Sequence, residues 1–89
     1  MDDKKIIEMF LARDENAIRA VEKKYGRLCY YVASNILACH EDCEECANDV
    51  FLALWNAIPP EIPENLRAYI AKATRNRALA ILRDSRSRG

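Results

Sequence analysis

All three prolines of this 89-residue chain fall in one stretch, Pro59-Pro60-Glu61-Ile62-Pro63, and the only glycines are Gly26 and Gly89. The rest of the sequence therefore has few residues that favour turns, which argues against an all-β fold and for long helices. Proline removes a backbone donor and restricts the residue before it. We therefore expect a helix to end at this stretch and a rigid, extended loop to follow.

Apolar residues recur at helical spacing on both sides of that loop and predict an all-α fold, a compact bundle of three to four helices. Asp14 is suited to cap the start of the second helix. Gly26 interrupts the pattern, so residues 15–38 form either one bent helix or two. The predicted order is N-terminal helices over 1–40, a helix over 41–58, a loop over 59–65, a helix over 66–84 and a frayed end over 85–89.

Composition limits the class of protein. Hydrophobic residues make up 51% and charged residues 31% of the chain, as in folded soluble domains. A chain of this length supports one domain with a modest core. Its apolar runs are far shorter than the roughly 20 residues that span a bilayer, and no secretory signal is present. We expect a cytoplasmic protein without membrane contact, whose four cysteines are free thiols.

Charge is divided unevenly along the chain. Residues 1–63 carry seven Lys/Arg and twelve Asp/Glu, whereas residues 64–89 carry seven Lys/Arg and two Asp/Glu. Such a division predicts two surfaces with different partners.

The basic surface follows the last predicted helix. Cations along a helix can neutralise phosphates, and asparagine and tyrosine can hydrogen-bond to or stack on bases. A solvated, salt-bridged face would mix the two signs more evenly, so nucleic-acid binding is favoured over that alternative. The candidate residues are Arg67, Tyr69, Lys72, Arg75, Asn76, Arg77 and Arg83, followed by Arg86 and Arg88.

The acidic surface lies on the preceding helix. No Lys or Arg occurs between residues 28 and 66, and Glu41, Glu45, Asn48 and Asp49 recur at helical spacing, so they can share one exposed face. Such a face repels DNA and suits a basic protein surface. Complementation of the helix dipole is the alternative, and it accounts for Glu41 and Glu45 better than for Asp49.

Three cysteines and the sole histidine form a third group, Cys39, His40, Cys43 and Cys46. Zinc accepts this set of ligands, but its usual sites take ligands from two separated elements. Cysteine is also among the most buried residue types. We therefore expect buried or incidental thiols here, with a metal or redox site as the alternative. The sequence shows no catalytic set and no glycine-rich phosphate loop, so we expect neither enzymatic activity nor a cofactor.

Three segments of the chain carry recognisable motifs. Residues 41–55 read EDCEECANDVFLALW, residues 65–79 read NLRAYIAKATRNRAL, and residues 10–18 read FLARDENAI. These motifs resemble the sigma-70 family of bacterial RNA polymerase sigma factors. The first resembles the region 2.2 pattern EDAEDLVQEVFLxLW, the second resembles the FRAWLxRIARNxAI pattern of regions 2.3 and 2.4, and the third is similar to the opening LxxGDExAF. The compact form is typical of the extracytoplasmic-function group.

The resemblance implies a helical region 2 domain that binds the coiled coil of the core polymerase β′ subunit and recognises and melts the −10 promoter element. The 41–58 helix would dock on polymerase, and the 59–65 loop, including Asn65, would hold a flipped base of the single-stranded non-template strand. Tyr69 would stack or wedge, and Arg67, Lys72, Arg75 and Asn76 would contact the strand. The residues at the polymerase contact would be Glu41, Glu45, Asn48, Asp49 and Leu52.

This sequence departs from the family pattern in several places. Asn48 and Asp49 shorten the usual Gln and Glu, and Tyr69 stands where Trp is common. A full factor of this group carries a linker and a second helical domain, so we expect residues 85–89 to begin a missing linker. Two other functions stay open: a helical module bound by an anti-sigma factor, and a cysteine-based metal or redox sensor.

Overall fold

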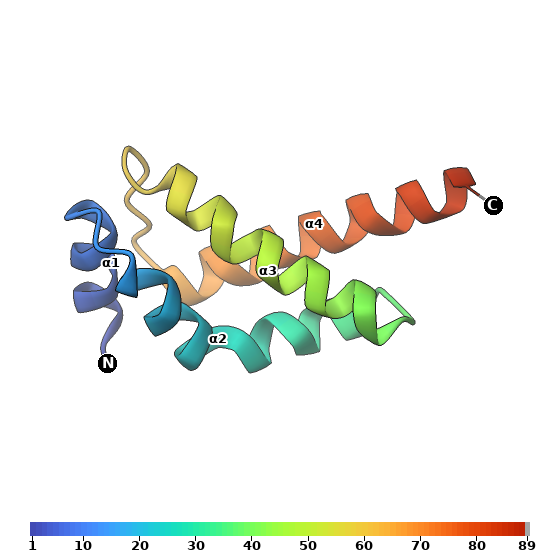
Figure 1. The fold of residues 1–89 in the computed structure, drawn as a ribbon, viewed down its shortest axis with the longest axis horizontal. Coiled ribbons are helices and arrows are strands. Elements are labelled where there is room, and N and C mark those ends of the chain that lie inside the picture. The colour runs from blue at the N-terminus through green and yellow to red at the C-terminus, as the bar shows by residue number, and fades with distance from the viewer. Residues whose placement is uncertain (89) are drawn as a thin grey trace.

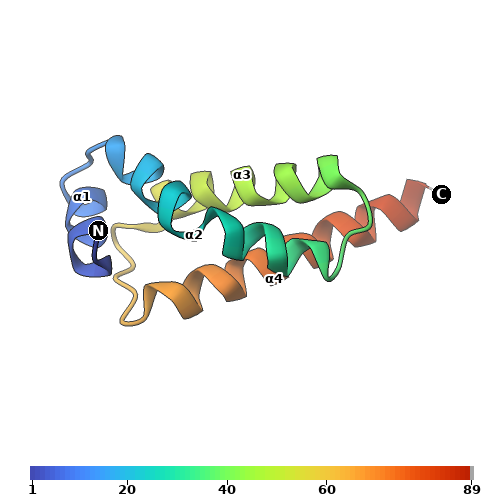
Figure 2. The same cartoon turned by 90° about the horizontal axis from the view of Figure 1, so that it is seen from below.

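Four helices make up the domain: α1 (Asp3–Leu11), α2 (Asn16–Ser34), α3 (His40–Ala57) and α4 (Leu66–Arg88). The computed structural model describes residues 1–88, and the side chains of residues 1–85. The described part contains no strand, which confirms the predicted all-α bundle. α2, α3 and α4 lie side by side along the long axis, while α1 packs across one end (Figures 1 and 2). The C-terminal turns of α4 project beyond the other helices, and the whole domain has extents of 43 × 22 × 21 Å.

Two helix boundaries differ from the sequence expectation. α2 is one continuous helix through Gly26, because the buried stripe of Val21, Tyr25 and Cys29 continues past it. Gly26 is half-buried beside that stripe, with open space where a side chain would project. α4 continues through Arg88, so the expected fraying from Ser85 is wrong for the described residues. The predicted linker residue Gly89 lies outside them.

The N-cap position of α2 falls on Glu15, whose side chain makes no capping bond, so the predicted cap at Asp14 lies one residue too early, although Asp14 does bond the start of the helix. The Asp14 side-chain Oδ1 accepts a hydrogen bond from the Asn16 N–H at 2.9 Å, and its carbonyl accepts one from the Ala17 N–H at 2.9 Å. These bonds satisfy two of the donors that a helix start leaves unpaired.

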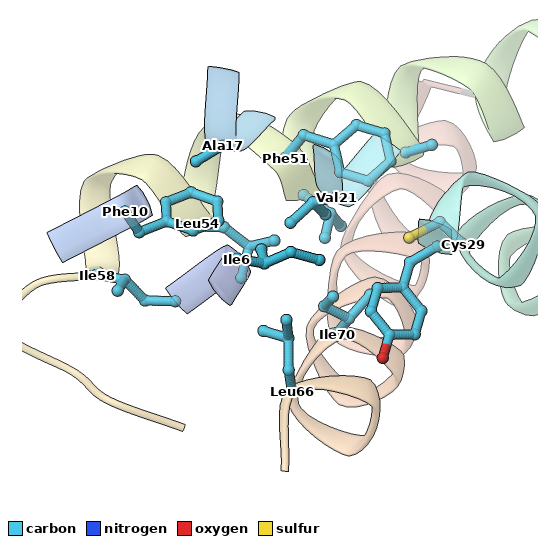
Figure 3. Packing of buried hydrophobic residues seen from close by; sticks show 13 residues of the cluster. Ile6, Phe10, Ala17, Val21, Cys29, Phe51, Leu54, Ile58, Leu66 and Ile70 are labelled. Carbon is cyan, nitrogen blue, oxygen red and sulfur yellow. The ribbon is translucent and has the colours of Figure 1, made fainter. Parts of the chain in front are cut away.

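The main core gathers at the end of the bundle where α1 meets the other three helices (Figure 3). Ile6 and Phe10 of α1 are fully buried, and they pack in one cluster with Val21, Leu54 and Ile70. A second cluster fills the opposite end of the bundle with Ala33, Leu37, Cys43, Cys46, Ala78 and Ile81. α1 is also attached from outside the core, because Asp3 accepts hydrogen bonds from Lys24 and from the Tyr25 hydroxyl, both at 2.7 Å.

Thr74 is a buried polar residue where α2, α3 and α4 meet. Its hydroxyl donates to the Ile70 carbonyl one turn earlier, at 2.7 Å, and lies 3.4 Å from Cys29 Sγ. The Cys46 thiol donates to the Thr74 carbonyl across the α3–α4 contact at 3.6 Å. Small residues at this point let the three helices approach one another without leaving a polar group unpaired.

The turn between α1 and α2 contains a strained residue. The Asp14 N–H donates to the Met9 carbonyl and the Arg13 N–H to the Phe10 carbonyl, at 2.9 and 3.1 Å, which is a Schellman ending of α1. Arg13 has φ 57°, the one positive value at a non-glycine residue in the described chain. A side chain in this conformation costs about 1–2 kcal/mol, and glycine is the usual residue there in the opening pattern that residues 10–18 resemble.

Burial along α3 separates core positions from surface positions two residues apart. Leu54 is 1% exposed and Leu52 is 57% exposed. Replacing Leu54 with alanine leaves a cavity, so Leu54→Ala should lower the free energy of unfolding by about 2–5 kcal/mol. Leu52→Ala is the matched control and should change it by less than about 0.5 kcal/mol. Urea unfolding followed by circular dichroism measures both, and equal losses would contradict the assigned core.

Candidate nucleic-acid and polymerase interfaces

α4 presents a basic face to solvent. Leu66, Ile70, Thr74, Ala78 and Ile81 are buried on one side. The exposed side carries Lys72, Arg75, Asn76 and Arg83. In the described chain Lys72 and Arg75 form no ion pair or side-chain hydrogen bond. Their charges are therefore available to an anionic partner.

The start of α4 is tied to the preceding loop by two of the predicted DNA-contacting residues. The Asn65 side-chain oxygen accepts a hydrogen bond from the Ala68 N–H at 3.0 Å, so Asn65 caps the helix. The Tyr69 hydroxyl donates to Glu61 Oε2 at 2.6 Å. This hydrogen bond, together with burial, raises the pKa of Tyr69 to about 12. Both side chains therefore hold the loop against the helix.

Arg67 and Arg77 flank the basic face instead of lying at its centre. Arg67 is exposed on the side of α4 toward α2. Burial and the hydrogen bond to Asp3 raise the pKa of the Tyr25 hydroxyl, and the charge of Arg67 opposes this rise only weakly. Arg77 Nε donates to Asp49 Oδ2 at 2.9 Å. Arg77 is thus engaged with α3 and is less available than Lys72 or Arg75.

α3 presents a different surface. Glu41, Glu45, Asn48 and Leu52 are all exposed and follow one another at helical spacing, so they form a single stripe, which we call the α3 stripe. Leu52 gives this acidic stripe an apolar member, which a merely solvated face does not require.

Asp49 does not belong to the α3 stripe. Its side chain is 34% exposed and turns toward α4, where it pairs with Arg77. Asp49 is therefore only partly exposed at the edge of the face that Glu41, Glu45 and Asn48 share, and its carboxylate is engaged with Arg77. The ion pair with Arg77 accounts for the acidic residue at position 49, which complementation of the helix dipole did not explain. The sequence could not reveal this pair, because the two residues are 28 positions apart.

The cysteines and the histidine do not converge. Cys43 and Cys46 are buried in the second core cluster, whereas Cys39 is exposed. His40 lies at the surface between the Tyr30 hydroxyl and Glu44, with its Nε2 2.6 Å from Glu44 Oε1. Within residues 1–88 no group of three or more potential ligands is placed to hold a metal ion.

Burial also determines the chemistry of the thiols. It raises the pKa of Cys29 and Cys43, and it raises the pKa of Cys46 to about 11. These three thiols are therefore protonated at neutral pH and act as small apolar groups of the core.

Arg13 contributes contacts that sequence reasoning missed. Its Nη1 donates to the carbonyls of Trp55 and Ile58, at 2.9 and 2.8 Å, and its guanidinium carbon lies 3.7 Å from the centroid of the Trp55 ring. The side chain thus spans from the α1–α2 turn to the end of α3. The only sequence signal was an arginine at a position where glycine is usual.

Two helices packed against each other, one with an acidic and apolar stripe and one with a basic face, give this all-α domain two chemically different surfaces. Residues 22–88 match the family model for sigma-70 region 2. The chain belongs to the sigma-70 region 2 family, so it has a sigma-factor role in transcription initiation. Searches of curated proteins and of solved structures returned no match. In the described residues, no helix is both long and apolar enough for a membrane span.

The burial of the thiols leads to a test of the sensor alternative. In the folded protein only Cys39 is exposed, so one thiol per chain should react rapidly with an aromatic disulfide reagent and the other three slowly. Cys39→Ser should remove the fast phase, and unfolding in urea should release all remaining thiols. Fast reaction of two or more thiols in the folded Cys39→Ser variant would contradict this burial.

Proposed function

We propose that the domain docks on the coiled coil of the core RNA polymerase β′ subunit through the α3 stripe, and binds the single-stranded −10 promoter element through α4 and the 59–65 loop. We include its placement in the extracytoplasmic-function group in this proposal. The observation that carries it is the division of charge between two adjacent helices of one bundle, with acids and Leu52 exposed on α3 and the unpaired cations Lys72 and Arg75 exposed on α4.

The docking half of the proposal follows from the composition of the α3 stripe. Glu41 and Glu45 provide long-range attraction toward a basic protein surface, and Leu52 provides apolar area that is removed from water on contact. The same acids repel phosphates. The α3 stripe is therefore suited to a protein and unsuited to DNA.

The DNA half of the proposal divides between phosphates and bases. Lys72 and Arg75 on α4 can neutralise phosphates, whereas the loop region carries Glu61 and Glu64 and repels them. We therefore place the strand's backbone along α4 and its bases toward the loop and Tyr69. Tyr69 is half-buried, so part of its ring stays accessible to an unpaired base.

The free energies of opening DNA and of stacking a base indicate why this domain would need core polymerase. Opening one DNA step costs about 1.4 kcal/mol on average, and one base stacked on an aromatic ring returns about 1–3 kcal/mol. Trapping a single base can therefore offset the opening of one or two steps. A longer opened region requires the phosphate contacts of α4 and the contribution of core polymerase.

An anti-sigma-type regulator is a second candidate partner, favoured by an apolar groove between α1 and the loop. Ile7, Leu11, Ile62 and Leu66 line it, and Leu11 and Ile62 are 40% and 63% exposed. A protein seated there would cover the side of the loop. Ile62→Glu should weaken the binding of such a regulator and leave the binding of core polymerase unchanged. A pull-down with each partner would measure both.

The phosphate contacts predict a salt effect. Lys72→Ala with Arg75→Ala should weaken binding of a labelled oligothymidylate by the domain with core polymerase. It should also reduce the slope of log affinity against log salt by about 1.4, at about 0.7 per phosphate of single-stranded DNA. Fluorescence anisotropy across a salt series measures both. Lys23→Ala with Arg27→Ala removes the same charge from the exposed face of α2 and is the matched control, and an equal effect of the two pairs would refute the assignment.

The docking surface predicts a loss confined to polymerase binding. Glu45→Lys with Leu52→Ala should weaken binding to core polymerase at least about tenfold, because a like charge and a lost apolar contact fall in the centre of the contact. Glu8→Lys, at an exposed position of α1, is the charge-matched control and should bind core polymerase normally. Biolayer interferometry with immobilised core enzyme measures both variants. Normal binding by the α3 variant would remove the α3 stripe from the interface.

A further inference from the structure

We infer that Arg13 is a positioning residue for promoter recognition: it fixes the point at which the 59–65 loop leaves α3. The inference rests on the proposed function, in which that loop receives a base of the opened strand. Arg13 itself belongs to the α1–α2 turn and to neither proposed interface.

The need for such a residue arises at the end of α3. In a continuing helix the N–H of residue 59 would donate to the Trp55 carbonyl, but Pro59 has no N–H. Pro60 likewise supplies no donor. The Trp55 carbonyl therefore loses its helical donor. The Ile58 carbonyl accepts no backbone hydrogen bond in the described chain, because the helix has ended, and the backbone bond that remains in this turn runs from the Glu61 N–H to the Ala57 carbonyl at 2.9 Å.

Arg13 supplies the missing donors. Its Nη1 lies 2.9 Å from the Trp55 carbonyl oxygen and 2.8 Å from that of Ile58. The guanidinium also stacks over the Trp55 ring, and its positive charge meets the negative end of the α3 dipole. One side chain thereby holds both carbonyls beside the first proline of the loop.

The backbone of Arg13 supports the same conclusion. Its φ of 57° is unfavourable for any residue with a side chain, and such strain persists where the surroundings determine it. Glycine would remove the strain and would also remove the contacts to α3. An arginine that keeps a strained backbone in order to bond two carbonyls is placed for those bonds.

The other end of the loop is held separately. Asn65 caps α4, and the Tyr69 hydroxyl bonds Glu61. With Arg13 at the first end, the loop is fixed at both ends and leaves α3 from a buried residue, Ile58. Loss of Arg13 loosens the first end only. It should therefore reduce the domain's preference for particular bases without removing the phosphate contacts on α4.

Two substitutions separate this role from a purely structural one. Arg13→Gly removes the clamp and relieves the strained backbone, whereas Arg13→Ala removes the clamp and keeps the strain. Stability should therefore be higher for the glycine variant, and urea unfolding ranks the two. If the clamp positions the loop, both variants should lose base selection equally, whatever their stability.

The experiment measures selection of bases with core polymerase present. Wild-type domain first enriches a preferred single strand from a random library, and affinity is then compared for that strand and a scrambled one. Both variants should lower the preference about tenfold, while affinity for the scrambled strand changes less than about twofold. Arg13→Lys keeps the charge but loses the planar guanidinium with its several N–H donors. Its preference for the selected strand should lie between that of the two variants and that of the wild type.

The outcomes distinguish the two claims. If wild-type domain shows no preference between the strands, the proposed function fails and the inference fails with it. If wild type shows a preference that both variants retain, or if the preference follows unfolding free energy so that alanine loses more than glycine, the inference alone is overturned.

Discussion

The packing of α3 against α4 determines where the charged residues of this domain can lie. Val50 and Cys46 face inward on α3, and Thr74 and Ala78 face inward on α4. Since each helix buries one side, its charges must occupy the opposite side. The acids of α3 and the cations of α4 are thereby kept on separate surfaces of one bundle.

The Asp49–Arg77 ion pair is where the two surfaces touch. It uses one acid that the sequence pattern places with the polymerase contact and one cation that it places with DNA. Because both side chains are partly exposed, the pair adds at most about 1 kcal/mol to stability. Its larger effect is to neutralise the charges of Asp49 and Arg77 where the two helices meet. Lys72 and Arg75 therefore attract phosphates more strongly than Arg77 does.

Periodicity was sufficient to predict the bundle, the buried side of α4 and three members of the α3 stripe, because helical spacing alone decides which residues share a face. It could not predict contacts between helices. Asp49 turned out to pair with Arg77, and Arg13 clamps the end of α3. Gly26 did not break α2, since the buried stripe continues past it. These outcomes depend on tertiary packing, which overrides local propensity.

The loop between α3 and α4 combines rigidity with exposure. Its prolines restrict the backbone, Arg13 holds its first end, and Asn65 and the Tyr69–Glu61 hydrogen bond hold its last. Ile62 nevertheless stays 63% exposed within it. A loop fixed at both ends and open in the middle can select a base with little ordering cost at the moment of binding.

The proposed function requires two faces of one bundle to contact different partners at the same time. A photoreactive amino acid placed at Asn48 on α3, and separately at Asn76 on α4, tests this most directly in a complex with core polymerase and single-stranded promoter DNA. Position 48 should crosslink to the β′ subunit and position 76 to DNA. Crosslinking of both positions to the same partner, or of position 48 to DNA, would contradict the proposed function.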